Sequence, residues 1–254
     1  MKSGWQAEMS LLIVGHRGAM AHQPENSLAS YALAEEIGVD EIELDVRLSR
    51  DEQLFLLHDA TLDRTAGDDS ARNRGPAAEL TLAELQAVVL DSGRGVVSLA
   101  EMYDATSTGI QLEVKDPAAV PFLAHFFAQR PEDAARTILT GFDAAAIRQA
   151  ADLIPHIPRC IIVKTITDAQ RFDGGWQGLV HYTRSTRFAC GFPGLDAQLV
   201  EAVHAHGLEL HVWPMRTLED MRRAVSLGVD GTTSDDPAQA KQWLQQVLDE
   251  RAGA

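Results

Sequence analysis

Basic residues are scarce in this sequence of 254 residues, which has 22 lysines and arginines against 37 aspartates and glutamates. The resulting formal charge of −15 argues against broad electrostatic binding to nucleic acid or to an anionic membrane. No apolar run is long enough to cross a bilayer, so we expect no stable membrane association. The charge does not exclude a small anionic substrate held by one metal ion and a few local cations.

Cysteine is rarer still, with Cys160 and Cys190 as the two examples. They lie far apart and lack the spacing of a metal site, so we predict a buried free thiol at each position and a reducing, cytoplasmic location. The first ten residues carry one lysine and no apolar segment, so we expect no secretion signal and predict that residues 1–10 are a lead-in. The sequence also lacks a G-x-G-x-x-G or Walker-type loop, which weakens a doubly wound nucleotide-binding fold.

Strand-like and helix-like segments alternate along the rest of the chain. The strand-like segments lie before His16 and at 41–48, 110–115, 137–140, 159–163, within 179–189, and at 208–213 and 229–233. About eight strand–helix units in a chain of this length favour a closed parallel barrel over an open sheet. We therefore predict an α/β fold, a (β/α)8 TIM barrel that forms a single domain over residues 11–254. The alternation breaks down at about 60–97, where glycine, proline and polar residues predict loop, with a short helix after Thr81.

The segment from Glu41 to Asp59 alternates between acidic and apolar residues before it reaches His58. In an extended strand, alternate side chains point to opposite faces, so Glu43 and Asp45 share one face. Two carboxylates on one face repel each other unless a cation lies between them, and oxygen ligands suit Mg²⁺ or Ca²⁺. For this segment alone, the alternative is an edge strand whose polar face lies in water.

Polar residues gather where the predicted strands end, which in a parallel barrel is the face that carries the active site. They are His16 and Arg17 after the first strand, Glu43 and Asp45 on the second, His58 just after it, Glu113 and Lys115 on the third, and Trp213 at the end of the seventh. Each has an ordinary explanation alone, such as a core histidine, a surface lysine or a core tryptophan. Their shared location instead favours a functional site.

The residue types at this face are together suited to cleavage of a phosphodiester. Carboxylates can hold one divalent cation, Mg²⁺ or Ca²⁺, cations can bind the phosphate, and a pair of imidazoles can move protons. The predicted metal ligands are Glu43, Asp45 and Glu113; the predicted phosphate- and substrate-binding residues are Arg17, Lys115 and Trp213; and the predicted general acid/base pair is His16 and His58.

A set of short motifs occurs in a fixed order along the chain. They are His16-Arg17-Gly18, Pro24-Glu25-Asn26-Ser27, Glu43-Leu44-Asp45, His58-Asp59, Leu62-Asp63-Arg64-Thr65, Glu113-Val114-Lys115, Gly228-Val229-Asp230-Gly231 and Ser234-Asp235-Asp236-Pro237. Together they resemble the glycerophosphodiester phosphodiesterase family from about Val14 to Pro237. The resemblance implies a (β/α)8 barrel with a small insertion after the second strand, here about 60–97, and the same metal, histidine and phosphate positions. It also implies that Glu25 supports the metal site, although a carboxylate at a helix start is the alternative.

The resemblance implies hydrolysis of glycerophosphodiesters, such as glycerophosphocholine or glycerophosphoethanolamine, to glycerol 3-phosphate and an alcohol. One alternative is a lysophospholipase D-like or other phosphodiesterase for lipid-linked substrates, which would need an exposed apolar rim. Another is a non-catalytic phosphate-binding barrel, which would lack a histidine or a ligand carboxylate. The sequence departs from the family at Val97-Ser98-Leu99-Ala100-Glu101, Gly141-Phe142 and Trp213-Pro214-Met215-Arg216. These departures leave the alcohol unspecified.

Overall fold

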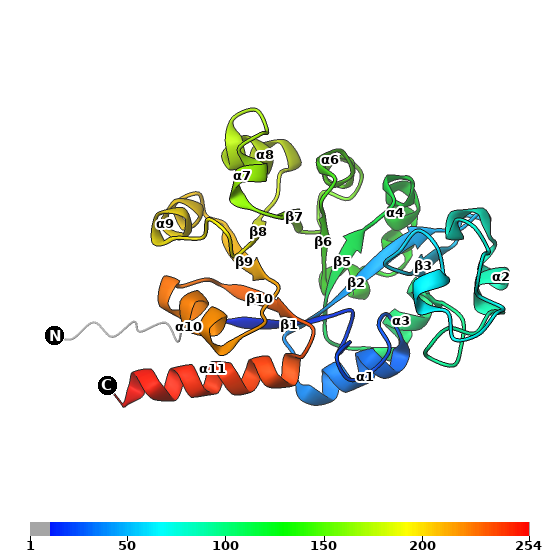
Figure 1. The fold of residues 1–254 in the computed structure, drawn as a ribbon. Helices are drawn as coiled ribbons and strands as arrows, with labels where there is room; N and C mark the ends of the chain where they lie inside the picture. The colour runs from blue at the N-terminus through cyan, green and yellow to red at the C-terminus, as the bar shows by residue number, and fades with distance from the viewer. Residues whose placement is uncertain (1–10, 254) are drawn as a thin grey trace.

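The computed structural model describes residues 11–253, so the predicted lead-in, residues 1–10, lies outside the described residues. Eight parallel strands within the described part close into a barrel, because β1 pairs with both β10 and β2. Helices surround the barrel (Figure 1), and the predicted (β/α)8 TIM fold is confirmed. The barrel strands are β1 (Leu12–His16), β2 (Glu41–Leu48), β5 (Gly109–Val114), β6 (Thr137–Gly141), β7 (Arg159–Val163), β8 (Arg187–Gly191), β9 (Glu209–Trp213) and β10 (Gly231–Ser234).

Side-chain caps begin most of the helices that the sequence predicts. Helix α1 (Leu28–Ile37) begins after Ser27, whose hydroxyl accepts from the backbone N–H of Ser30. A capping box at Thr81, where the sequence predicts a helix start, begins α2 (Leu82–Gln86), and a second capping box at Ser98 begins α3 (Leu99–Ala105). The other helices are α4 (Val120–Gln129), α5 (Pro131–Ala135), α6 (Ala144–Leu153), α7 (Ile166–Ala169), α8 (Gly175–Thr183), α9 (Ala197–Ala205), α10 (Leu218–Leu227) and α11 (Pro237–Ala252).

The strand expected within 179–189 is partly wrong, because helix α8 occupies Gly175–Thr183 and β8 begins only at Arg187. Gly175 and Gly178 give this segment a low helix propensity, so the sequence did not indicate the helix. Gly178 is required there, since a Cβ would lie 1.9 Å from the carbonyl oxygen of Asp173. The helical segment that contains α4 and α5 was not predicted either.

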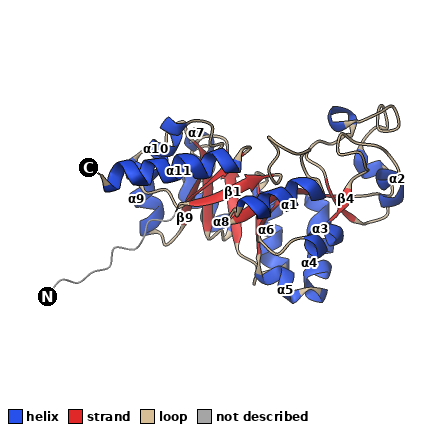
Figure 2. Ribbon diagram, turned by 90° about the horizontal axis from the view of Figure 1, so that it is seen from below, coloured by secondary structure: helices blue, strands red, loops and turns tan. Residues whose placement is uncertain are grey.

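Two short antiparallel strands, β3 (Leu54–Leu56) and β4 (Val97–Ser98), extend the sheet beyond β2, and the insertion lies between them. Strand β3 runs antiparallel to β2, and β4 runs antiparallel to β3. The segment between them, which contains α2, lies beside the barrel in both views (Figures 1 and 2) and is drawn in cyan to green in Figure 1. It has an apolar core of its own, formed by Phe55, Leu57, Leu62, Ala71, Ala77, Leu80, Leu85, Val88, Leu90 and Val96. The chain therefore leaves the barrel topology at β3, before residue 60.

Ion pairs fill the interior at the amino-terminal end of the barrel. The buried guanidinium of Arg187 is 2.7 Å from Glu41 Oε2 and 2.8 Å from Glu209 Oε2. Gln111 donates to the same Glu41 oxygen at 2.6 Å. Because each charge has a hydrogen-bonded partner, this network avoids the cost of an unpaired buried charge.

Two further expectations concern the cysteines and membrane-spanning helices. Cys160 and Cys190 are both free and buried, as predicted. Among the helices that the structure describes, none combines the length and the apolar character that a membrane span requires.

Candidate active site

A cavity of about 270 Å³ opens at the carboxyl ends of the barrel strands. Most of the predicted site residues line it, and Asp45 lies beside it within the acidic cluster. Glu25 does not line it. The lining residues are His16, Arg17, Glu43, His58, Gln111, Glu113, Lys115, Phe142, Ile162, Lys164, Ala189, His211, Val212, Trp213, Pro214 and Thr233.

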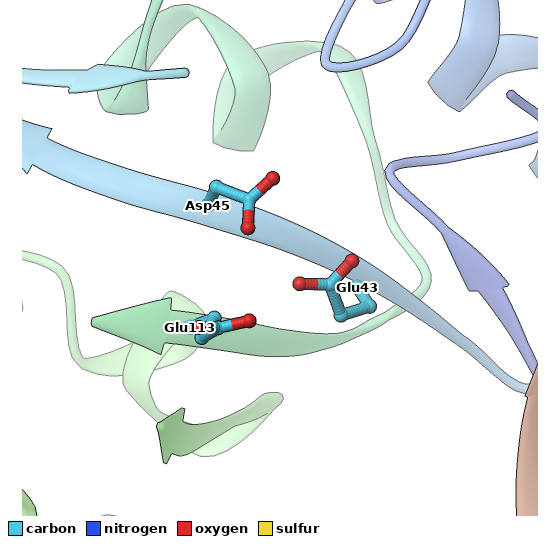
Figure 3. A group of neighbouring side chains, drawn as sticks. All are labelled: Glu43, Asp45 and Glu113. Atoms are coloured by element: carbon cyan, nitrogen blue, oxygen red, sulfur yellow. The ribbon is translucent and has the colours of Figure 1, made fainter. Parts of the chain in front are cut away.

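Three carboxylates from two neighbouring strands converge at this cavity. Glu43 and Asp45 project from β2 and Glu113 from β5, where Asp45 and Glu113 are partners in the strand register (Figure 3). One oxygen of each lies within 4.8 Å of the others, and all three residues are buried. The alternation read from the sequence places Leu44 and Val46 in the apolar core on the opposite face.

Hydrogen bonds leave part of this acidic cluster unsatisfied. Within the described residues, Glu43 Oε1 and Asp45 Oδ1 are buried and have no hydrogen-bond partner. Lys115 Nζ lies 2.7 Å from Glu113 Oε1 and 3.1 Å from Asp45 Oδ1, the second without hydrogen-bond geometry. Burial, together with the charges of Asp45 and Glu113, raises the pKa of Glu43 to about 8. The pKa of Asp45 is lowered in spite of its burial, because Lys115 and Arg17 lie beside it.

These residues fit a hard divalent cation. The donors are all carboxylate oxygens, which is the ligand type of Mg²⁺ and Ca²⁺. Two of those oxygens are buried without a partner, and a cation between them would satisfy both. Burial, and then repulsion from Asp45 and Glu113, raises the pKa of Glu43, and a cation would relieve this repulsion.

His16, at the end of β1, is held by Asp235, a carboxylate of the motif at 234–237 to which the sequence assigned no role. Its Nδ1 donates to Asp235 Oδ1 at 2.5 Å, just after β10. Its Nε2 lies 3.8 Å from Glu43 Oε2, so the ring spans the gap between Asp235 and the acidic cluster. Burial alone would lower the pKa of His16, but the hydrogen bond to Asp235 and the charge of Glu43 raise it. Closure of the barrel places β1 beside β10, so His16 and Asp235 meet although they lie 219 residues apart in the chain.

His58 comes from the insertion side and not from a barrel strand. The expected strand ends at Leu56, and His58 lies in the loop that follows. Its Nδ1 donates to Asp59 Oδ1 at 2.6 Å, and the guanidinium of Arg47 donates to its carbonyl oxygen at 2.6 Å. Burial and the nearby cations lower the pKa of His58, although the charge of Asp45 opposes them.

Arg17 connects the loop after β1 to the acidic cluster. It adopts a φ of 50°, which is uncommon for a residue other than glycine. In this conformation its backbone N–H donates to Glu43 Oε2 at 3.1 Å, and its Nε lies 3.3 Å from Asp45 Oδ2. Its Nη1 donates to Glu25 Oε1 at 3.0 Å, so Glu25 acts on the site through Arg17 and not by lining the cavity.

The opposite side of the cavity is apolar and was largely missed by the sequence. Phe142 and Trp213 pack edge to face there, with ring centroids 5.5 Å apart, beside Ile162 and Val212. Apolar residues at strand ends look like core residues in a sequence, so no signal separates them. Lys164 also lies on this side and adds a positive charge.

His211 lies at the cavity floor and was also missed. It is buried, and neither ring nitrogen has a hydrogen-bond partner within residues 11–253. Gly231 makes room for the ring, since a Cβ there would lie 2.2 Å from it. Burial, and then the charge of Arg187, lowers the pKa of His211 well below its usual range. The alternation that places Trp213 in the cavity also points His211 inward and could have found it.

The chain matches one protein family and resembles known proteins in sequence and in fold. Residues 16–239 match the Glycerophosphoryl diester phosphodiesterase family. The chain is 27% identical to the glycerophosphodiester phosphodiesterase of Caldanaerobacter subterraneus subsp. tengcongensis, an alignment that covers 90% of this chain and 96% of that protein. It resembles the structure of an Oleispira antarctica phosphodiesterase in complex with the product sn-glycerol-3-phosphate, with a TM-score of 0.79 and 24% identity over 94% and 96% of the two chains. The Thermotoga maritima glycerophosphodiester phosphodiesterase structure gives a TM-score of 0.77 and 21% identity over 92% and 98%.

Proposed function

The chain belongs to the glycerophosphoryl diester phosphodiesterase family, and from that premise we propose that it hydrolyses glycerophosphodiesters to glycerol 3-phosphate and an alcohol. One observation carries the proposal: a buried cluster of three carboxylates opens into a cavity that two carboxylate-held histidines also line. A non-catalytic barrel would have no need to keep this set together.

The carboxylates of Glu43, Asp45 and Glu113 would hold one divalent cation, Mg²⁺ or Ca²⁺. Such a cation would supply Lewis-acid stabilisation of the negative charge that develops on the phosphate oxygens. Their unpaired oxygens, and the raised pKa of Glu43, support this assignment.

Arg17 and Lys115 would bind the phosphate of the substrate. Both lie at the cavity next to the acidic cluster, and each keeps a positive charge within reach of an incoming anion. Arginine can pair with two phosphate oxygens at once, whereas lysine acts as a point charge. Glu25 would keep the Arg17 guanidinium in place, and Trp213 would form part of the substrate wall.

His16 and His58 would act as the general acid/base pair. Each donates from Nδ1 to a carboxylate, which fixes the ring and leaves Nε2 available to the substrate. One Nε2 would take the proton from the attacking hydroxyl. Attack by water would give glycerol 3-phosphate directly, whereas attack by the neighbouring hydroxyl of the substrate would give a cyclic phosphate that water must then open to glycerol 3-phosphate. The other would give a proton to the oxygen of the departing alcohol.

A lipid-linked substrate is the second candidate. One side of the cavity wall is apolar, and Phe142 on that side is 41% exposed. An apolar alcohol or acyl chain could pack there. We rank this second because the exposed apolar surface at the cavity is one phenylalanine and not a continuous rim, within the residues that the structure describes.

The test is hydrolysis of a panel that includes glycerophosphocholine, glycerophosphoethanolamine, glycerophosphoglycerol and a lysophospholipid. It is followed as release of glycerol 3-phosphate from the first three and of lysophosphatidate from the lysophospholipid. We expect turnover of the glycerophosphodiesters, loss of turnover in EDTA, and recovery with Mg²⁺ or Ca²⁺. Full activity after exhaustive chelation would refute the metal role, and release from none of the panel would refute the function. Faster turnover of the lysophospholipid would reverse the ranking of the two candidates.

We further propose that the partner is this small substrate rather than nucleic acid, and that the protein acts in the cytoplasm. The net charge of −15 and the two buried free thiols support these proposals. Binding to labelled DNA or RNA at physiological salt would contradict the first.

A further inference from the structure

Arg64 makes two paired contacts that the proposed function does not use. Its guanidinium donates to both oxygens of Glu25, from Nη1 to Oε2 at 2.6 Å and from Nη2 to Oε1 at 2.7 Å. It also donates to both oxygens of Asp59, from Nε to Oδ2 at 2.6 Å and from Nη2 to Oδ1 at 3.2 Å. Paired contacts of this kind fix the orientation of both groups as well as their distance.

Each of the two carboxylates in turn holds a residue of the proposed site. Asp59 accepts from Nδ1 of His58, and Glu25 accepts from Nη1 of Arg17. The guanidinium therefore joins the His58 side of the cavity to the Arg17 side, although Glu25 and Arg64 are 39 residues apart in the chain. We propose that Arg64 is a positioning residue, which aligns His58 with the phosphate bound at Arg17.

The exposure of the two carboxylates explains why they need this arginine. The Asp59 side chain is 31% exposed, so without Arg64 it could turn toward water and release His58. Hydrogen bonding to Arg64, its largest influence, lowers the pKa of Asp59 to about 2, so the group stays charged and accepts from the imidazole. The Glu25 side chain is only 8% exposed, so the loss of Arg64 would leave a nearly buried carboxylate with Arg17 as its remaining cation.

The insertion fixes the backbone of Arg64. Arg64 lies in the short 3₁₀ helix η1 (Asp63–Thr65), between the buried residues Leu62 and Thr65. The carbonyl oxygen of Thr65 accepts from the N–H of Asp91 at 2.8 Å, which ties η1 to the far end of the insertion. The apolar core of the insertion therefore holds the arginine, and through it His58, in register with the barrel.

An ordinary surface ion pair is the competing explanation, because the Arg64 side chain is 47% exposed and exposed pairs contribute little. A surface pair would leave turnover unchanged when it is removed. The paired geometry at both ends, and the burial of Glu25, argue for the positioning role.

The inference rests on the proposed function, so the experiment begins with the wild-type rate of glycerol 3-phosphate release. The variants are Arg64→Ala and Arg64→Lys. The matched control is Arg72→Ala, an arginine of the same insertion whose contact with the exposed Asp69 is 3.8 Å long. We measure kcat, KM, Mn²⁺ affinity by calorimetry and the melting temperature for each protein, and we repeat the rates with added guanidinium ion.

We expect Arg64→Ala to lower kcat by about 30-fold, in line with the cost of a misplaced catalytic group, and KM to change far less. The Mn²⁺ affinity should stay within about twofold, because Arg64 touches none of the three proposed ligands. Guanidinium should restore part of kcat, and Arg64→Lys, which keeps the charge but not the paired contacts, should fall between wild type and alanine. Arg72→Ala should match wild type.

A folded Arg64→Ala enzyme with kcat within twofold of wild type would overturn the inference. So would a loss of kcat that guanidinium does not relieve at all. If the alanine variant fails to fold, Arg64→Lys decides by the same kcat criterion. If the wild type releases no glycerol 3-phosphate, the proposed function fails; the ¹⁵N shifts of the His58 ring then test the inference alone, since they must change in Arg64→Ala and not in Arg72→Ala.

Discussion

The two sides of the cavity come from different stretches of the chain and have different chemistry. Residues 16–115, on β1, β2, β5 and the insertion, supply the carboxylates, the histidines and the phosphate-side cations. Residues 142–214, on and after β6 to β9, supply an apolar wall with one lysine, and His211 at the floor. From this contrast we propose that residues 16–115 perform the chemistry and that residues 142–214 select the alcohol. Variants on the two sides should therefore affect different kinetic constants.

The largest effect should follow from a single carboxylate on the polar side. Glu113→Gln keeps the shape of the side chain but removes a charge from the proposed ligand set. Because a metal ion contributes several kcal/mol of transition-state stabilisation, we expect kcat/KM to fall by about 10⁴-fold. Calorimetry should also show weaker Mn²⁺ binding.

The matched control is Glu132→Gln, on an exposed turn of α5, which should keep wild-type rates and metal affinity. Unchanged metal binding in Glu113→Gln would mean that Glu113 is not a ligand.

The next effect concerns the histidines. His16→Ala and His58→Ala should each lower kcat by about 10³-fold, because each removes a group that we propose to move a proton. Circular dichroism should be unchanged, since both side chains line a cavity rather than fill the core. His125→Ala, on the exposed face of α4, provides the control. A near-normal kcat in either cavity variant would break the assignment of the chemistry to this side.

A smaller effect should come from the apolar side. Phe142→Ala removes an exposed ring that packs on Trp213, so stability should change little while KM rises about fivefold for substrates with an apolar alcohol. The value of kcat should stay within about twofold. Leu153→Ala, an exposed apolar residue of α6 outside the cavity, is the control. A fall in kcat without a change in KM would contradict the proposed division between the two sides.

The smallest effect should appear in stability at the cavity floor, where the two sides meet. Burial lowers the pKa of His211 well below 6.5, so below pH 6.5 the unfolded chain binds a proton that the folded chain does not. The free energy of unfolding of the wild type should therefore fall by about 1.4 kcal/mol more between pH 7.5 and 5.5 than that of His211→Leu. Urea unfolding at pH 7.5 and 5.5 measures the difference. Equal pH dependence of the two proteins would show that His211 is protonated while folded.

The same contrast explains what could be predicted from the sequence. Charged residues inside otherwise apolar strands are conspicuous, so Glu43, Asp45 and Glu113 stood out, and the alternation of strands and helices was enough for the barrel. Of the apolar wall, the sequence predicted Trp213 and marked Phe142 as a departure from the family. It did not predict Ile162, since an isoleucine at a strand end is indistinguishable from a core isoleucine. Contacts between distant segments were hidden as well: Asp235 meets His16 only because the barrel closes.

The ion pairs of Arg187 with Glu41 and Glu209 lie between the catalytic cavity and the opposite end of the barrel. Because these ion pairs close the barrel interior, substrate and product can enter and leave the cavity only at the carboxyl ends of the strands. The phosphorylated product must leave by the route that the next substrate needs, and while it remains it would occupy the phosphate site that we propose at Arg17 and Lys115. Accumulated product should therefore compete directly with substrate, which would tie the flux through this enzyme to the rate at which later reactions clear that product.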